Sequence, residues 1–246
     1  MQQHQQHPSI SVVLTSYKRP TLGMQLKCIA DQTIPVKSED IHVIYNSYDE
    51  RSYPNDNRIK IYELNWNSKF HGRFAIALLC QTEYVLILDD DMFPRSRWVE
   101  QCLYSINNFK DGIYGGSGIV LRDQNKYIPH TKVGWNGEHY NYNQEVHLVG
   151  HSWFMKTEYL HALWMERPTN WNNGEDIALS YLARKHLGIK SFITPHSLDR
   201  MDVWSTNPQM SKEWGMDDNA SYKLGNHYED RNQLISYYSS SENTES

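Results

Sequence analysis

The sequence predicts an α/β domain with a mostly parallel central sheet flanked by helices. Short apolar segments alternate with helical patterns through about residue 110, an order typical of parallel strands joined by crossover helices. The apolar run 84–88 leads without a spacer into Asp89, Asp90 and Asp91. Open α/β sheets bind their ligands just beyond the carboxyl ends of the strands, which is where these aspartates would lie. A length of 246 residues suits one domain of this class.

The first half of the chain supplies four of the predicted strands and three of the helices. The strands are short apolar runs, whereas the helices carry apolar residues three or four positions apart, as Leu22 and Leu26 are. In chain order the predicted strands are 10–15, 41–46, 59–64 and 84–88, and the predicted helices are 21–31, 73–80 and 96–106.

Beyond residue 110 the pattern changes to strands separated by polar turns. Strands are predicted at 113–122, 126–133, 145–150 and 190–195, with one helix beginning near Glu175. Residues 196–230 are predicted as a long loop region, and such loops in compact domains are usually functional or disordered. The polar ends, 1–8 and 236–246, are predicted to be a disordered lead-in and tail, which leaves 9–235 as a single domain.

Composition argues against several classes of function. A net charge of −5 and a pI of about 6.2 give no basic face for nucleic acid or anionic lipid. The three cysteines are odd in number and lack CxxC spacing, which argues against zinc and a full disulfide framework. Reduced thiols fit a cytoplasmic protein, or a soluble domain trimmed from a longer one. No apolar run approaches the roughly 20 residues of a membrane span.

The acidic cluster Asp89, Asp90 and Asp91 is predicted to bind a divalent cation. Like charges packed this closely repel one another and need a cation to neutralise them. Carboxylate oxygens suit Mg²⁺ or Mn²⁺, hard cations that also bind phosphates. A solvated acidic turn is the alternative.

Two segments carry side chains suited to such a site. Thr15, Tyr17 and Arg19 follow the first strand in a loop without a glycine-rich phosphate fingerprint. Hydroxyls, an aromatic ring and an arginine can hold a base and a pyrophosphate without one, although an ordinary polar turn would read the same. Glu175 and Asp176 open a predicted helix, where acids are favoured by the macrodipole whether or not they are catalytic.

Two further segments have both a functional and a structural interpretation. In VGHSWFMK a strand is expected to end at Gly150 and to present His151 at its tip, either for function or as a hydrogen-bonded structural histidine. In HYEDR, His227 and Arg231 could fold back over a metal–diphosphate, or could simply belong to a charged surface helix.

The order of these motifs resembles glycosyltransferases of the GT-A fold. The stretch from VVLTSYKRP to LDDD is similar to the family-2-like nucleotide-diphospho-sugar transferases. Several details resemble the exostosin-like transferases: ELNWNSKFHGRF before the acidic strand, the DDD triplet, LVGHSWF, and GEDIA in place of their CEDIA-type motif. The resemblance covers roughly residues 9–235.

The resemblance implies a UDP-sugar donor, Mn²⁺ or Mg²⁺, and a glycan or other hydroxyl acceptor. It implies a nucleotide-binding half at 9–110 and an acceptor-binding half at 111–235, with a lid over 196–230. The implied metal-binding residues are Asp91 and His227, and the implied catalytic carboxylates are Asp176 and Glu175. The implied donor-binding residues are Thr15, Tyr17, Arg19, Asn46, Arg73, Asp89, Asp90 and Arg231.

The stereochemical course stays open at this point. If the enzyme inverts, Asp176 would deprotonate the acceptor hydroxyl; if it retains, as the exostosin-like resemblance implies, Asp176 would stabilise the sugar cation or act as nucleophile. A nucleotidyltransferase that makes nucleotide sugars is one alternative, disfavoured by the lack of glycines in SYKRP. A non-catalytic sugar-binding module on the same fold is another. A metal-dependent hydrolase is disfavoured because the chain has no HxH or HExxH pattern.

Overall fold

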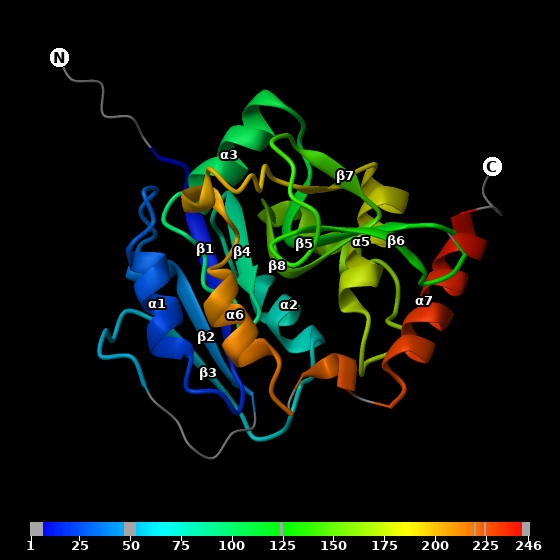
Figure 1. Cartoon of the computed structure of the whole chain (residues 1–246). Coiled ribbons are helices and arrows are strands. Elements are labelled where there is room, and N and C mark those ends of the chain that lie inside the picture. The colour runs from blue at the N-terminus through cyan, green and yellow to red at the C-terminus, as the bar shows by residue number, and fades with distance from the viewer. Residues whose placement is uncertain (1–6, 47–52, 124, 219, 224, 243–246) are drawn as a thin grey trace.

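The computed structural model describes residues 7–46, 53–123, 125–218, 220–223 and 225–242 (Figure 1). Most of the predicted lead-in lies outside these residues. A central sheet flanked by helices is confirmed, with the strand order β3-β2-β1-β4-β8-β5-β9-β7 and β6 paired with β5. The strands are β1 (Ile10–Ser16), β2 (Ile41–Asn46), β3 (Lys60–Leu64), β4 (Tyr84–Leu88), β5 (Ile113–Leu121), β6 (Pro129–Gly134), β7 (Gln144–Val146), β8 (Leu148–Lys156) and β9 (Ser191–Ile193).

The first four strands form the parallel half that the sequence predicts. β1 lies between β2 and β4, with Val12 opposite both Ile41 and Leu86. The intervening helices are α1 (Leu22–Ala30) and α2 (His71–Ala77), and α3 (Trp98–Asn108) follows β4. Because these strands run in one direction, their carboxyl ends meet at one edge, and the acidic cluster follows β4 there.

The second half of the sheet is antiparallel where it joins the first, so the prediction of a mostly parallel sheet is wrong for this half. β8 runs antiparallel to both β4 and β5, and among the strand pairs described here four are parallel and four antiparallel. The single strand predicted at 145–150 is in fact two, because the chain leaves β7 and enters β8 at Leu148. His151 therefore lies inside a strand that continues to Lys156, not at a strand tip.

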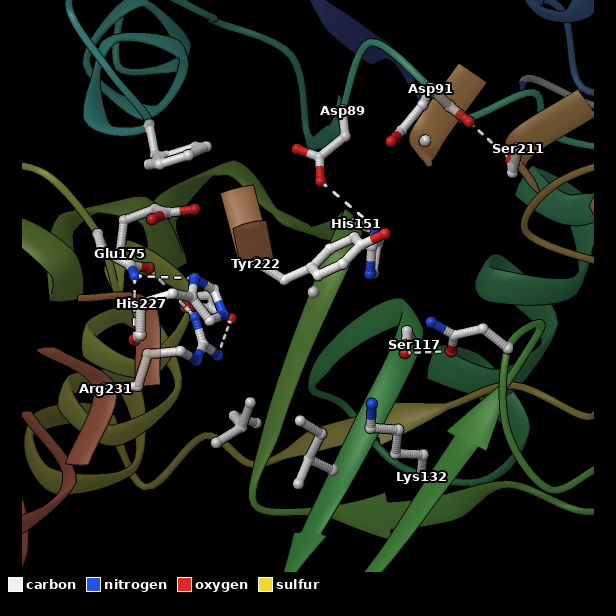
Figure 2. A pocket seen from close by; sticks show the side chains of 18 of the residues that line it. Asp89, Asp91, Ser117, Lys132, His151, Glu175, Ser211, Tyr222, His227 and Arg231 are labelled. Atoms are coloured by element: carbon white, nitrogen blue, oxygen red, sulfur yellow. Dashed lines mark hydrogen bonds and ion pairs between the residues drawn. The ribbon is translucent and has the colours of Figure 1, made fainter. Parts of the chain in front are cut away.

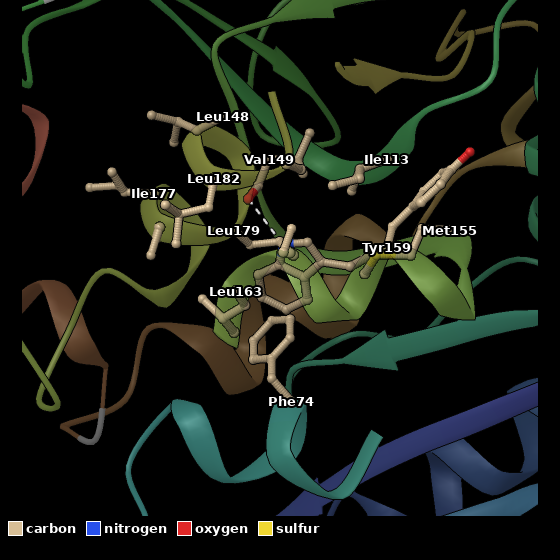
Figure 3. Packing of buried hydrophobic residues seen from close by; sticks show 14 of the residues in the cluster. Phe74, Ile113, Leu148, Val149, Met155, Tyr159, Leu163, Ile177, Leu179 and Leu182 are labelled. Atoms are coloured by element: carbon tan, nitrogen blue, oxygen red, sulfur yellow. Dashed lines mark hydrogen bonds between the residues drawn. The ribbon is translucent and has the colours of Figure 1, made fainter. Parts of the chain in front are cut away.

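Helices cover both faces of the sheet, and each face has its own hydrophobic core. Alternate residues of a buried strand point to opposite faces, so Val13 joins one core while Val12 and Leu14 join the other. Figure 3 shows the first core, where Phe74 of α2 and Leu179 of α5 (Glu175–Leu187) pack near β8. α1 and α3 contribute to the second core.

The C-terminal region is more ordered than predicted. Residues 196–230 contain the helix α6 (Pro208–Gly215), and α7 (His227–Glu242) continues through the start of the predicted disordered tail. α7 buries Leu234, Ile235 and Tyr238 against the first core, so its apolar contacts outweigh the polar composition that predicted a tail. Asn207 accepts hydrogen bonds from the backbone N–H groups at the start of α6, a cap that the Asn-Pro pair in the sequence could have indicated.

Two expectations from composition concern membrane spans and thiols. In the ranges that the structure describes, no helix has both the length and the apolar character to cross a bilayer. Cys28, Cys80 and Cys102 are free thiols, and Cys80 and Cys102 are buried.

The buried histidine His196 connects the end of β9 to the segment around Ser205. His196 is 1% exposed, and its Nδ1 lies 2.8 Å from the Thr194 carbonyl oxygen while the Ser205 backbone N–H points at its Nε2. The carbonyl can only accept and the amide can only donate, so the ring is neutral with its proton on Nδ1. Burial lowers the pKa of His196 to about 4.

Acidification is therefore expected to destabilise the fold between pH 6.5 and 4. In this pH window His196 binds a proton in the unfolded chain but stays neutral in the folded protein. The free energy of unfolding therefore falls as pH falls, by on the order of 2 kcal/mol for this residue. Chemical denaturation at stepped pH measures the slope. His196→Gln is expected to flatten it, whereas His130→Gln, at an exposed position, leaves it unchanged. An unchanged slope in His196→Gln would contradict the assignment.

Candidate active site

A cavity of about 720 Å³ opens where the end of β4, the middle of β8 and the start of α5 meet (Figure 2). Asp89 and Asp91 line one wall, and Glu175 and Asp176 line another. Figure 2 shows His151 beneath the two aspartates and Arg231 beside Glu175. Segments far apart in the sequence thus bring their acidic groups to one cavity.

The acidic loop after β4 is fixed by neighbours on two sides. From α1, the Gln25 amide donates to the carbonyl oxygens of Asp89 and Met92, at 2.7 and 3.0 Å. From α6, the Ser211 hydroxyl donates to the Asp91 carbonyl oxygen at 2.6 Å. The backbone that presents the three carboxylates is therefore anchored before any ligand arrives.

The carboxylates of this loop lie close together and, among the described residues, Asp90 and Asp91 both contact Arg19. Arg19 Nη1 lies 2.5 Å from Asp90 Oδ1 and 3.5 Å from Asp91 Oδ2, and the same guanidinium also pairs with Asp217. Burial, followed by the charge of Asp91, still raises the pKa of Asp90, and burial with the charge of Asp89 raises that of Asp91. The ionised forms of Asp90 and Asp91 are therefore disfavoured despite Arg19, and a bound divalent cation would stabilise them.

Arg73 connects the acidic loop to the start of α5. Its guanidinium lies 2.6 Å from Asp89 Oδ1 and 2.8 Å from Glu175 Oε1, and the side chain is 7% exposed. It also lies over the Trp153 ring, 4.9 Å from the centroid. Burial raises the pKa of Glu175 to about 7 despite the charge of Arg73.

Asp176 is held as an ionised carboxylate. Arg231 of α7 contacts it through two nitrogens, at 3.0 and 2.7 Å, and the Ile177 backbone N–H donates to it at 2.9 Å. Burial alone would raise its pKa, but the charge and hydrogen bonds of Arg231 outweigh this effect and keep the pKa of Asp176 below its usual value. The guanidinium lies over the Tyr127 ring, so its position is fixed as well.

The start of α5 requires a glycine. Gly174 precedes the helix with φ +84°, and a Cβ there would lie 2.0 Å from Leu234 Cδ1 of α7. The left-handed backbone disfavours any side chain at this position, and Leu234 would have to shift to admit one.

Gly174→Ala is expected to lower the free energy of unfolding by roughly 2–4 kcal/mol, because a strained φ and an overpacked contact add. The matched control is Gly188→Ala at the other end of α5, where φ is +67° and the added Cβ meets nothing within 4 Å. It should cost about 1 kcal/mol. Urea unfolding of both variants measures the difference, and equal losses would contradict the role of the Leu234 contact.

The residues assigned to the base lie beside the cavity and do not line it. Asn46, at the end of β2, accepts hydrogen bonds from the Ser68 backbone N–H and hydroxyl and donates to Asn67 at 3.0 Å. Asn67 in turn donates to the Tyr17 hydroxyl at 3.1 Å. The Thr15 hydroxyl is buried and has no hydrogen-bond partner within the described ranges. The structure thus brings Tyr17 and Asn46 into one polar network.

His227 lines the cavity on the side of α5, where its Nδ1 lies 3.1 Å from Asn173 Nδ2. The group of side chains that could bind a metal ion among the described residues does not include His227. Asp89, Asp91 and His151 each offer a ligand atom, and these three atoms lie within 4.8 Å of one another. His227 is not a member of this cluster, although Asp91 and His227 both line the cavity.

The donor set of this cluster fits a divalent cation. Asp91 Oδ1 and His151 Nδ1 are buried atoms without a hydrogen-bond partner in the part of the chain that the structure describes. Carboxylate oxygens suit Mg²⁺ and Mn²⁺ alike. Sequence reasoning singled out His151 but assigned it no role, because its proximity to the aspartates depends on the antiparallel pairing of β4 with β8.

Comparisons with solved structures agree with this architecture. Two crystal structures of S. aureus TarS 1–349, the second described as a complex with UDP, match with TM-scores of 0.54 and 0.55 at 14% identity. The matches cover 76% and 77% of this chain but only 60% and 58% of those chains. At this identity the likeness shows the fold. No curated protein matches the sequence.

The family follows from the sequence profile. The model described as "Glycosyl transferase family 2" matches residues 11–164, which is more than half of the chain and spans β1 through α4 (His161–Trp164). The matched segment includes the acidic loop and His151. The expected GT-A architecture is thereby confirmed, and the chain belongs to glycosyl transferase family 2.

Proposed function

We propose that this protein transfers a sugar from a UDP-sugar to a hydroxyl of a glycan or other acceptor, with the help of Mn²⁺ or Mg²⁺. The observation that carries the proposal is the pairing of two acidic sites across one cavity: the loop Asp89–Asp91 and the α5 carboxylates, joined by Arg73. Glycosyl transfer needs charge neutralised at the leaving diphosphate and a carboxylate near the developing sugar cation.

UDP as the nucleotide is supported by the fold shared with TarS, which was crystallised in complex with UDP. We assign uracil and ribose to the polar network of Tyr17 and Asn46, together with Thr15 and Arg19. This network lies at the edge of the sheet where the parallel strands end, so a nucleotide there would direct its diphosphate toward the acidic loop. Asp90 would contact the ribose or donor sugar.

In the reaction, a bound divalent ion would neutralise the charge that builds on the diphosphate; Asp91 would hold that ion. Arg73 and Arg231 provide fixed positive charge on the α5 side of the cavity. Asp176, kept ionised by Arg231, would face the anomeric carbon or the acceptor hydroxyl, and Glu175 is its neighbour. The anomeric configuration of the product decides whether Asp176 acts as a base or stabilises the cation.

The segment 196–230 would act as a lid over the donor. α6 already contacts the acidic loop, since Ser211 donates to Asp91 and a Cβ at Gly215 would lie 2.7 Å from Asp91 Oδ2. Water excluded by this cover could not hydrolyse the donor. In the proposed division, residues 9–110 bind the nucleotide and 111–235 bind the acceptor.

The experiment that tests the function measures thermal unfolding with UDP, with Mn²⁺ and with both, then screens UDP-sugars for UDP release. A ligand that binds only the folded state raises the midpoint by mass action. We expect the largest rise with both ligands, and turnover with at least one UDP-sugar once an acceptor is added. No shift with any nucleotide would overturn the transferase assignment, and a stable nucleotide–metal complex without turnover of any sugar would favour a binding module.

A further inference from the structure

His151 occupies a backbone conformation that a side chain rarely adopts. Its φ is +66°, in the left-handed region. Gly115 pairs with Trp153 and Ser117 with Gly150, so two residues of β8, one of them His151, oppose one residue of β5. This is a β-bulge, a feature that re-aims side chains and often lies next to active sites.

Glycine is the unstrained residue for a left-handed bulge position, and this chain carries a histidine there. The bulge turns the imidazole toward the acidic loop, as Figure 2 shows. The backbone carbonyl oxygen of His151 accepts from the Asp89 N–H at 2.9 Å, which ties the bulge to the loop. The Trp135 ring meets the imidazole edge-on at 5.7 Å and supports its orientation.

The distances suit a shared cation better than a direct bond. His151 Nδ1 lies 3.7 Å from Asp89 Oδ2, too far for a hydrogen bond. Two ligands on one divalent ion, each about 2.1 Å from it, are separated by roughly 3 to 4.2 Å. The nitrogen is shielded from solvent and lacks a hydrogen-bond partner among the described residues, as does Asp91 Oδ1. Both atoms are desolvated without compensation until something binds them.

We propose that His151 is a protein ligand of the divalent cation, together with Asp89 and Asp91, and that its imidazole makes the site prefer Mn²⁺ over Mg²⁺. The inference rests on the proposed function and deepens it. Two carboxylates and an imidazole offer the ion three ligand atoms. Mg²⁺ favours an all-oxygen shell, whereas first-row transition ions accept imidazole nitrogen, so the nitrogen ligand discriminates between them.

The test measures metal binding directly. Mn²⁺ and Mg²⁺ are titrated calorimetrically, each with saturating UDP, and pulsed electron paramagnetic resonance of bound Mn²⁺ reads coupling to ¹⁴N. We expect the wild type to bind Mn²⁺ at least tenfold more tightly than Mg²⁺ and to show ¹⁴N coupling. His151→Gly should weaken Mn²⁺ at least tenfold, leave Mg²⁺ within about threefold, and lose the ¹⁴N signal.

Folding does not confound this variant. Glycine is unstrained at φ +66°, so the midpoint of His151→Gly without metal should equal or exceed that of the wild type. His130→Asn, at an exposed position on β6, removes a histidine elsewhere and should keep both the affinity and the ¹⁴N coupling.

The outcomes separate this inference from the proposed function. Tight Mn²⁺ binding with ¹⁴N coupling in His151→Gly, alongside loss of binding in Asp91→Asn, would overturn the role of His151 and leave the transferase intact. Equal affinity of the wild type for Mn²⁺ and Mg²⁺ would overturn the metal preference. Failure of the wild type to bind either ion in the presence of UDP would overturn both proposals.

Discussion

Asp176→Asn is expected to lower kcat by about 10³-fold while leaving the affinity for UDP and Mn²⁺ within a few-fold of the wild type. Arg231 holds the carboxylate across the cavity from the acidic loop, so under the proposed function its charge would act on the reacting sugar and not on the nucleotide. Loss of a general base, or of the charge that faces a developing cation, typically costs 10²- to 10⁴-fold. Steady-state kinetics with the best UDP-sugar, with UDP binding measured separately, gives both quantities.

The substitution also leaves Arg231 short of a negative partner, so stability must be checked. Asparagine keeps one oxygen for the guanidinium, and the loss of charge in a buried pair can cost several kcal/mol. Glu175→Gln is the matched control for stability only. It also removes a buried charge, but its partner Arg73 still has Asp89 as an ion-pair partner. If Asp176→Asn is folded and within tenfold of wild-type kcat, the catalytic assignment is wrong.

Asp91→Asn is expected to abolish the joint stabilisation by UDP and Mn²⁺ and to lower kcat/KM by 10³-fold or more. Asparagine offers the ion a neutral oxygen in place of a carboxylate, so the diphosphate loses its counter-charge. Without ligands the variant should be at least as stable as the wild type at neutral pH. Burial and the charge of Asp89 raise the pKa of Asp91, which means that the folded state disfavours its ionised form.

Thermal unfolding with and without both ligands measures these two effects together. Asp31→Asn is the control, since this exposed carboxylate pairs only with Lys27 on α1 among the contacts described. It should respond to UDP and Mn²⁺ as the wild type does. If UDP and Mn²⁺ raise the unfolding midpoint of Asp91→Asn as much as that of the wild type, the acidic loop does not belong to the donor site.

The parts of the fold that local pattern dictates were predictable. β2 and β4 begin and end where their apolar runs do. α5 begins at the acidic pair Glu175 and Asp176, directly after Gly174, as the sequence predicts. The antiparallel half depends on pairing between distant segments, which no local pattern encodes. That pairing is what brings His151 to the aspartates. The C-terminal helix was missed because three buried residues stabilise it within a polar sequence.

The arginine partners of the acids were predicted as ligand contacts, and the structure places them on the acids themselves. Arg19 and Arg231 were assigned to the base and the diphosphate, yet here they neutralise Asp90 and Asp176. Residue type and order indicated that cations and anions belong to one site. Which cation meets which anion depends on packing in three dimensions, and sequence spacing carries no record of it.

Arg73 makes the two acidic sites thermodynamically dependent on each other. One guanidinium is divided between Asp89 and Glu175, at 2.6 and 2.8 Å. An ion bound by Asp89 would leave Arg73 to pair with Glu175 alone, and a ligand bound by Glu175 would leave Arg73 to pair with Asp89. By thermodynamic reciprocity, each binding event would change the free energy of the other by the same amount. Under the proposed function, binding of the donor and binding of the acceptor would therefore be coupled through this one side chain.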